Sequence, residues 1–163
     1  DLDDFNVMNA DPLVMQHFPA ILSAKESKKS MEKQITKYDE KGYCYFAVDE
    51  LSSGKLIGMI GISDKDFEAS FTPCIDIGWR IAKEFWNKGY ATEGAKRCLQ
   101  YAFETLNLHR IISIAPKVNT NSIQVMKKIG MYKIDDFKHP HLLEHKNLVD
   151  CVCYEIKPPQ GIL

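Results

Sequence analysis

At Gly42 the apolar residues of this sequence change their period, and that change limits the folds open to the chain. Residues 26–41 read as a polar helix with apolar side chains at helical spacing, and Gly42 follows as a helix C-cap would. From there the period falls to two, so residues 43–49 and 55–63 are predicted to be strands joined by the turn LSSG. The sequence therefore predicts a sheet with helices packed on it.

The second half of the sequence alternates strand-like and helix-like segments. Strands are predicted at residues 74–81, 110–115, 131–135 and 148–156, helices at 91–106 and 122–129, and a further short helix at the opening DLDDFNVMN. The nearly all-apolar segment 110–115 is typical of a strand covered on both faces. The expected fold class is a mixed α+β, or three-layer α/β, architecture with helices on both faces of the sheet.

Composition excludes several classes of partner. The chain of 163 residues fits a single domain, and 21 Lys and Arg against 22 Asp and Glu give no basic excess for nucleic acid. No apolar stretch is long enough to span a bilayer, and the acidic start DLDDFNVMNADP does not resemble a signal peptide. An odd set of five scattered cysteines favours a reducing cytoplasm over a disulfide framework.

The segment EFWNKGYATEGAKRCL carries a possible anion site. Gly89 follows a strand and a short loop and stands directly before a helix, whose first N–H groups and dipole attract negative charge. Lys88 adds a positive charge. The pattern alone also fits a plain turn, and neither the P-loop motif nor the dinucleotide-binding motif is present.

A second constellation follows about thirty residues later, in the run VNTNSIQVMKKIGM. Asn119 and Ser122 stand between the end of a predicted strand and the start of a predicted helix. Each could cap that helix, and each could instead contact a ligand.

Together, FWNKGYATEGAKRCLQYAF, LNLHRI and VNTNSIQVMKKIGM resemble the GNAT superfamily of acyl-CoA-dependent N-acetyltransferases. The GYATE and NTNS runs and the later HPHLLEHKNL and CYEI are similar to its RimJ/RimL-like subgroup, which is named for acetylating ribosomal-protein N-termini. The resemblance extends from Tyr43 to Ile156. It implies a mostly antiparallel twisted sheet with a central V-shaped splay, and transfer of an acetyl group from acetyl-CoA to a primary amine.

The resemblance also bears on domain organisation. Residues 1–163 are expected to form one GNAT-like domain, as a monomer or a homodimer. Family members usually open with a strand, whereas this sequence opens at the helix DLDDF, so that first strand is expected to be absent from it.

The residues implied for acetyl-CoA binding fall into three groups. The family's phosphate loop maps onto Trp86, Asn87, Lys88, Gly89, Tyr90 and Ala91, with Trp86 in place of the usual Gln or Arg. The strand before it is implied to pair with the pantetheine arm through Trp79, Arg80 and Ile81. The asparagine that reaches the pantetheine maps onto Asn119, and Ser122 is implied to bind the cofactor as well.

The implied chemistry is direct attack of a neutral amine on the thioester. A backbone N–H near Ile81 could hold the developing oxyanion. Asp76 is the candidate base, acting through water or orienting the ammonium, and alternation places it on the face of its strand opposite Trp79. It could equally be paired structurally with Arg80 or another neighbour. The tyrosine that donates a proton in many members is replaced by Met126, so Ser122 is the candidate acid.

The acceptor is expected to lie among segments 15–18, 67–71 and 139–143. No metal is expected, since the histidines 139, 141 and 145 read as a structural loop. A non-catalytic CoA-binding sensor or structural module is the alternative function, and a nucleotide-binding protein is a weaker one.

Overall fold

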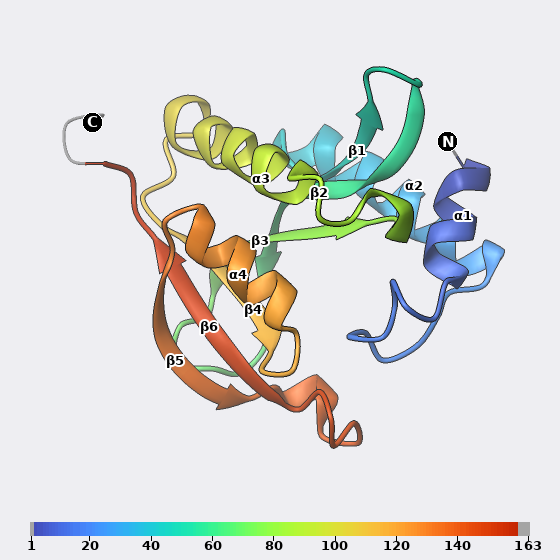
Figure 1. Ribbon diagram of the computed structural model, residues 1–163. Coiled ribbons are helices and arrows are strands. Elements are labelled where there is room, and N and C mark those ends of the chain that lie inside the picture. Colours follow the sequence, from blue (N-terminus) through green and yellow to red (C-terminus); the bar gives the residue numbers. More distant parts are fainter. Residues whose placement is uncertain (1, 160–163) are drawn as a thin grey trace.

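The computed structural model describes residues 2–159, in which helices and strands follow one another as the sequence predicts (Figure 1). The helices are α1 (Leu2–Ala10), α2 (Ala24–Lys41), α3 (Tyr90–Gln100) and α4 (Thr120–Lys128). The strands are β1 (Tyr45–Glu50), β2 (Lys55–Lys65), β3 (Cys74–Ile81), β4 (Ile111–Pro116), β5 (Tyr132–Lys138) and β6 (Asp150–Ile156). Short helical turns are η1 (Lys83–Phe85), η2 (Tyr101–Thr105) and η3 (Pro140–Leu142). No helix in this described range is long and apolar enough to cross a membrane.

Local signals define the ends of α2 and of the hairpin that follows. Ser23 and Glu26 form a reciprocal capping box at the start of α2, and Gly42 ends it with φ of 75°. The turn between β1 and β2 closes with Gly54 at φ of 66°, as the LSSG motif predicts. The predicted apolar side of α2 is only partly buried, because Ile35 and Tyr38 remain 59% and 49% exposed.

The six strands form one sheet in the order β1-β2-β3-β4-β6-β5. Every neighbouring pair is antiparallel except β3 and β4, which are parallel. Those two strands pair only at Asp76 and Ile112, and the Ser113 hydroxyl donates a hydrogen bond to the Ile77 carbonyl at 3.0 Å beside that point. Beyond it the strands diverge, which confirms the V-shaped splay in the middle of the sheet.

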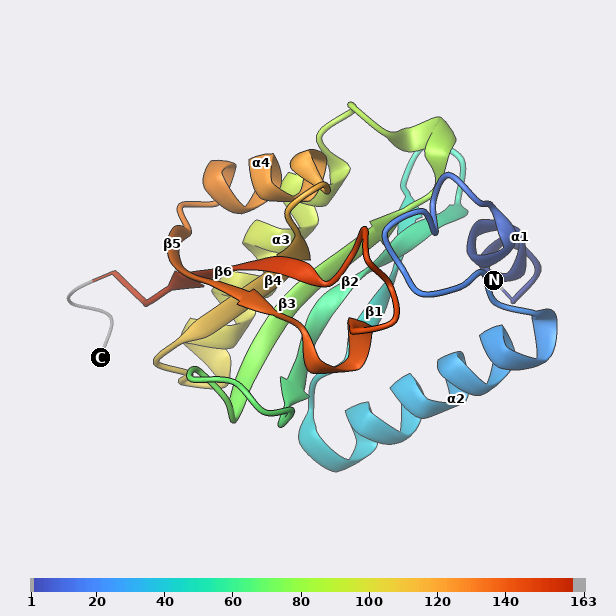
Figure 2. The ribbon, with the colours of Figure 1, turned by 90° about the horizontal axis from the view of Figure 1, so that it is seen from below.

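Helices cover both faces of the sheet, so the molecule has three layers (Figure 2). Helices α3 and α4 lie on one face, and α1 and α2 lie on the other. The main apolar core fills the α3–α4 side, where Ile60, Ala95 and Met126 are each at most 1% exposed. A smaller core under α1 is centred on Phe5 and Met8.

The long helix predicted for residues 91–106 is interrupted. It is α-helical to Gln100 and then continues as one π-helical turn, Tyr101–Thr105. The wider turn keeps Ala102 and Phe103 buried while the Tyr101 hydroxyl donates to the Gly42 carbonyl at 2.8 Å. This tertiary hydrogen bond to the end of α2 accompanies a change in backbone geometry that the apolar stripe alone did not predict.

The last three strands are joined by a buried carboxylate. Glu155 of β6 is 6% exposed and accepts hydrogen bonds from Arg110, just before β4, and from Tyr132 of β5. Strand β4 is buried on both faces, as its nearly all-apolar sequence predicts: Ile111 and Ile112 are fully buried. This half of the sheet stands on the far side of the splay from β1, β2 and β3.

Candidate active site

Strand β3 carries different side chains on its two faces and backbone hydrogen-bonding groups along its edge. Alternation places Trp79 towards α4, and Asp76 and Arg80 towards α1 and α2. The Ala82 N–H bonds back to Ile57 of β2, so the backbone groups of Trp79 and Ile81 are directed to the β4 side. Because β4 has diverged there, these groups can pair with a ligand instead of a strand.

On the α4 face, two predicted site residues meet through their side chains. The Trp79 indole N–H donates to the Ser122 hydroxyl at 3.3 Å. Asn119 is the N-cap of α4, since its Oδ1 accepts from the Ser122 backbone N–H at 3.1 Å. The capping interpretation therefore applies to Asn119, while the Ser122 hydroxyl is left to contact Trp79 on the open side of the helix.

The loop from β3 to α3 is tied to the end of the strand. The Trp86 indole N–H donates to the Ile81 carbonyl at 2.7 Å, which gives the aromatic residue at this position a structural task. Asn87 adopts a left-handed backbone with φ of 60°, and the exposed Lys88 ammonium lies 4.8 Å from the Phe85 ring centroid. The loop thus enters α3 with a fixed backbone and with the positive charge of Lys88 beside the helix start.

Gly89 is the N-cap of α3 and has φ of 91°, a conformation that side-chain-bearing residues rarely adopt. No side chain of the described residues caps this helix, and a Cβ on Gly89 would meet no described atom within 4 Å. The helix start is therefore open as well as uncapped, which suits an anion. Nearby, Ala91 packs against the core and the Tyr90 hydroxyl donates to Glu50 at 2.6 Å.

Asp76 lies at the closed end of the splay, with its side chain on the α1–α2 face. The Tyr45 hydroxyl donates to its Oδ1 at 3.1 Å, and the Lys65 ammonium lies 3.5 Å from the same oxygen. Burial raises the pKa of the Asp76 carboxyl above its ordinary value, although Lys65 and Tyr45 act against the rise. Of the structural pairings considered for Asp76, the structure shows Lys65 and Tyr45 in place of Arg80.

Arg80 lies on the same face, under α1 and the connection from α1 to α2. Its Nη1 donates to the Asn9 Oδ1 at 2.5 Å, and the Phe18 ring centroid lies 4.2 Å from its Cζ. Any contact of Arg80 with the cofactor would therefore come from its backbone, since its side chain is directed away from α4.

The two predicted catalytic residues are on opposite faces of the sheet. Ser122 stands with Trp79 on the α4 side, and Asp76 stands with Tyr45 on the α1–α2 side. A ligand placed between the diverging strands would thus have a carboxylate on one side and a hydroxyl on the other. This arrangement suits a reaction in which proton removal and proton donation occur at different ends of the reacting group.

Sequence reasoning missed the partners of both charged residues. Tyr45, Lys65 and Asn9 come from β1, β2 and α1, far from β3 in sequence. Phe18 lies in a segment predicted to surround the acceptor, but its contact with Arg80 was not predicted. None of them stands in a motif, so no local signal could have identified them.

Two of the three segments predicted to surround the acceptor lie together. Phe67 packs against His139 with ring centroids 4.4 Å apart and also contacts Phe71 and Phe137. The third segment contributes Phe18 over Arg80. Over residues 2–159, no three His, Cys, Asp or Glu side chains gather in an arrangement that could hold a metal ion.

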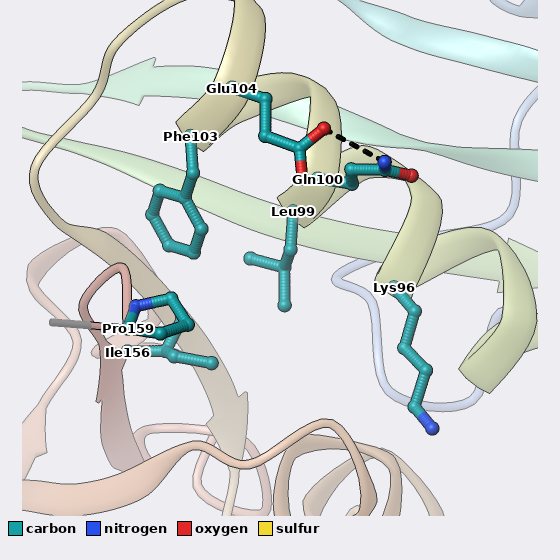
Figure 3. Close-up of a pocket in the computed structure, with 7 residues that line it drawn as sticks. All are labelled: Lys96, Leu99, Gln100, Phe103, Glu104, Ile156 and Pro159. Carbon is teal, nitrogen blue, oxygen red and sulfur yellow. Dashed lines mark hydrogen bonds between the residues drawn. The ribbon is translucent and has the colours of Figure 1, made fainter. Parts of the chain in front are cut away.

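Two hollows elsewhere on the molecule belong to other segments. A pocket of about 230 Å³ lies between the C-terminal part of α3, η2 and the end of β6, with Leu99, Phe103 and Ile156 among its lining residues (Figure 3). A groove of about 670 Å³ beside α2 is lined by Lys33, Lys37 and Lys65, among others. None of the predicted site residues lines either hollow, although Lys65 connects the second one to Asp76.

Known proteins share both the sequence and the fold. Residues 1–132 match the acetyltransferase (GNAT) domain family. The uncharacterized N-acetyltransferase YnaD of Bacillus subtilis is 48% identical over 63 residues, which are 39% of this chain and 37% of YnaD. The chain thus matches little more than a third of the length of that relative.

Solved structures extend the likeness over nearly the whole chain. A GNAT-family acetyltransferase from Bacillus anthracis is 28% identical, with a TM-score of 0.79 over 96% of this chain and 89% of that one. The ribosomal-protein-S5-alanine acetyltransferase of Vibrio fischeri shares the fold at 18% identity, with a TM-score of 0.72 over 97% of this chain and 89% of that one. The matched family covers the splayed strand, the open helix start and the Trp79–Ser122 contact, and the chain belongs to the GNAT superfamily of acetyltransferases.

Proposed function

We propose that this acetyltransferase takes its acetyl group from acetyl-CoA and passes it to a primary amine by direct attack. The observation that carries the proposal is that β3 leads, through one short loop, to the start of α3. Among the described residues, β4 pairs with this strand only at Asp76, so the Trp79 backbone and the Ile81 N–H are left at the open edge. A short loop then leads to an uncapped helix start with Gly89 at φ of 91°. Acetyl-CoA has an extended arm with amide groups, followed by phosphates, and so matches these two features in the same order.

The cradle for the phosphates would consist of the loop and first helical turn at residues 86–91. The first N–H groups of α3 would bind phosphate oxygens, and Lys88 would add a positive charge. The backbone of Trp79 and Ile81 would pair with the amide-bearing arm. Asn119 would approach the same arm from the start of α4, opposite its capping bond to Ser122.

Each catalytic residue has a defined task in the proposed transfer. The amine nitrogen bonds to the acetyl carbon, the carbonyl becomes an oxyanion held by a backbone N–H near Ile81, and the carbon–sulfur bond then breaks. Asp76 takes the proton lost by the amine. Since it is five residues from Ile81, roughly 16 Å along the strand, it acts through a relay of several waters and not by direct contact. The Ser122 hydroxyl passes a proton to the departing thiolate and regains one from solvent.

The acceptor is proposed to be a protein N-terminal α-amine or a small amine. The GYATE and NTNS runs support placement in the RimJ/RimL-like subgroup, which is named for acetylating ribosomal-protein N-termini. We further propose that residues 1–163 act as one domain, as a monomer or a homodimer. The five free cysteines support a reducing, cytoplasmic setting.

Thermal unfolding with and without acetyl-CoA tests the cofactor, with ATP and NAD as controls. At about 100 times its dissociation constant, a ligand adds roughly 2.7 kcal/mol to the free energy of unfolding. For a domain of this size the midpoint should rise by about 5–10 °C with acetyl-CoA alone. An equal rise with ATP or NAD, or no rise at saturating acetyl-CoA, would contradict the proposal.

Transfer itself is followed by the release of free CoA thiol in the presence of N-terminal peptides and small amines. We expect release that depends on the amine and a product heavier by one acetyl group. Binding of acetyl-CoA without transfer to any amine tested would instead support the non-catalytic module.

A further inference from the structure

Arg80 is a largely buried cation without an acidic partner. Among the residues that the structure describes, no ion pair within 4.0 Å includes its guanidinium, whereas Asp76 on the same face is paired with Lys65. Its hydrogen-bond partner is the neutral amide of Asn9, which is itself fully buried and donates to Ser27 at 3.1 Å. Buried charges are normally paired, because an unpaired one loses its hydration without compensation.

The guanidinium nitrogens are also incompletely hydrogen-bonded. Of its three nitrogens, Nη1 is bonded to Asn9, while Nε is shut off from solvent and has no partner among residues 2–159. Burial lowers the pKa of Arg80 to about 10, and the Tyr45 hydroxyl opposes this only in part. A negative charge beside the guanidinium would reverse that effect, since opposite charges favour the ionised form.

The position of Arg80 connects this charge to the open edge of the sheet. It lies between Trp79 and Ile81, the two residues whose backbone groups are directed to the β4 side. Its side chain emerges on the face opposite Ser122, where it contacts Phe18 of the α1–α2 connection. A group that reached Arg80 would therefore approach the acetyl group from the face opposite α4.

We propose that Arg80 binds a carboxylate on the amine acceptor, so that the substrates are primary amines that also carry a carboxyl group. The inference rests on the proposed function and names its acceptor class. A planar guanidinium with a free terminal nitrogen pairs well with one carboxylate, and Nη2 is the donor that remains for it. A doubly charged phosphate would leave one negative charge uncompensated in this largely buried place, which costs free energy and favours a carboxylate.

Asp76 supports the assignment from the other end of the same face. Four residues separate it from Arg80, and the Tyr45 ring lies between them against Gly78. The face therefore presents an acidic group and a basic group about 13 Å apart along the strand. A carboxylate on the acceptor would pair with Arg80, while Asp76 stays available to take the proton of the amine through intervening water.

The test compares a series of ω-amino acids of increasing chain length with their carboxamides, by CoA release with acetyl-CoA as donor. At the best chain length, kcat/KM for the acid should exceed that for its amide by roughly 10- to 100-fold, the worth of a charge-assisted hydrogen bond. Aminoalkyl phosphates form a third arm. Equal rates for acid and amide at every length, or faster turnover of the phosphates, would overturn the assignment.

Two variants and a control attribute the preference to Arg80. Arg80→Gln removes the charge, and Asn9→Asp keeps Arg80 but supplies an internal carboxylate where Oδ1 now accepts from Nη1. Both should bring the acid-to-amide ratio close to unity, mainly through a higher KM for the acid. Arg97→Gln, which removes an exposed arginine of α3, should keep the wild-type ratio. A ratio unchanged in Asn9→Asp would overturn the inference even if Arg80→Gln failed to fold.

The design separates this inference from the proposed function. Transfer to amines without any acid preference leaves the proposed function standing and removes the role of Arg80. If no amine is acetylated, the proposed function fails, and the same acids are then tested as ligands by thermal unfolding. A rise in Tm that Arg80→Gln and Asn9→Asp abolish would still support a carboxylate site, and no rise would overturn it.

Discussion

Among single residues, Asp76 shows a conflict between stability and reactivity. Its carboxyl is 6% exposed, and burial raises its pKa despite Lys65 and Tyr45. Because folding favours the protonated form, the fold loses this contribution as the pH rises through the raised pKa of Asp76. The charged form that a base requires is thus the form that stabilises the protein less.

Asp76→Asn should therefore separate the two properties. Asn resembles the protonated carboxyl and can still accept from Tyr45, so Tm at neutral pH should equal or exceed that of the wild type. Amine-dependent CoA release should fall by roughly 10²- to 10⁴-fold, the usual contribution of a general base. Wild-type turnover in the variant would assign Asp76 a structural role alone.

The pH dependence gives an independent check on Asp76. In the wild type, kcat/KM should fall on the acid side as the carboxylate is protonated, at a higher pH than for an ordinary Asp because its pKa is raised. After correction for the measured pKa of the acceptor amine, this acid limb should be absent in Asp76→Asn. A limb that persists unchanged would belong to another group.

Ser122→Ala tests the proton donor on the other face. The change removes the acceptor of the Trp79 N–H but leaves the capping bond from the Ser122 backbone to Asn119. We expect turnover to fall by about tenfold, the worth of one hydrogen bond to a charged group, with acetyl-CoA affinity unchanged. Gln124→Ala, on the exposed side of α4, is the matched control and should change neither quantity.

At the scale of elements, the start of α3 combines a left-handed turn with an open helix end. Gly89 and Gly54 both have positive φ, 91° and 66°, and a Cβ on either would meet no described atom within 4 Å. The two positions thus share the same conformational requirement, but only Gly89 stands at the proposed phosphate cradle.

Gly89→Ala and Gly54→Ala form a matched pair. Each should lower the free energy of unfolding by about 1–2 kcal/mol, because a left-handed backbone is unfavourable for alanine. Gly89→Ala should also weaken acetyl-CoA binding by about tenfold or more, as helix N–H groups are displaced from the phosphates, measured by calorimetry. Equal affinities in the two variants would show that Gly89 serves only as a turn.

For the whole molecule, the splay divides the sheet into two halves that differ in how they are held. The β1–β2–β3 half contacts α1 and α2, while β4, β6 and β5 share the buried Glu155. Burial raises the pKa of Glu155, but hydrogen bonds from Tyr132 and Arg110 outweigh burial and leave it lowered. This carboxylate therefore stabilises the fold above its ordinary pKa, and the contribution is lost as the pH falls through the lowered value.

Glu155→Gln should destabilise the protein by about 1–3 kcal/mol at neutral pH, since it removes charged hydrogen bonds at a buried position. The difference from the wild type should shrink and vanish in acid, below the ordinary value near 4.5. Denaturant unfolding at a series of pH values measures this difference in the free energy of unfolding. Asp150→Asn on the same strand breaks an exposed pair with Lys138 and should cost no more than about 1 kcal/mol. Equal losses in both variants would contradict the role of Glu155.

Short-range patterns in the sequence were enough to predict the helices, the strands and the Gly89 turn. Period, capping residues and turn glycines act over a few residues, so the strand Cys74–Ile81 and the Gly89 turn could be predicted directly. Alternation along the strand likewise separated Asp76 from Trp79. The π-helical turn at Tyr101 could not be predicted, because it accompanies a contact with Gly42 that is distant in sequence.

The surroundings of the two charged residues of β3 depend on the tertiary fold. Lys65 and Tyr45 contact Asp76 because strands from separate parts of the chain bring them to one face. Arg80 lacks a carboxylate among the described residues because α1 and its connection cover it with an amide and an aromatic ring. Burial and pairing are sums over neighbours from the whole fold, and no short segment of sequence contains those neighbours.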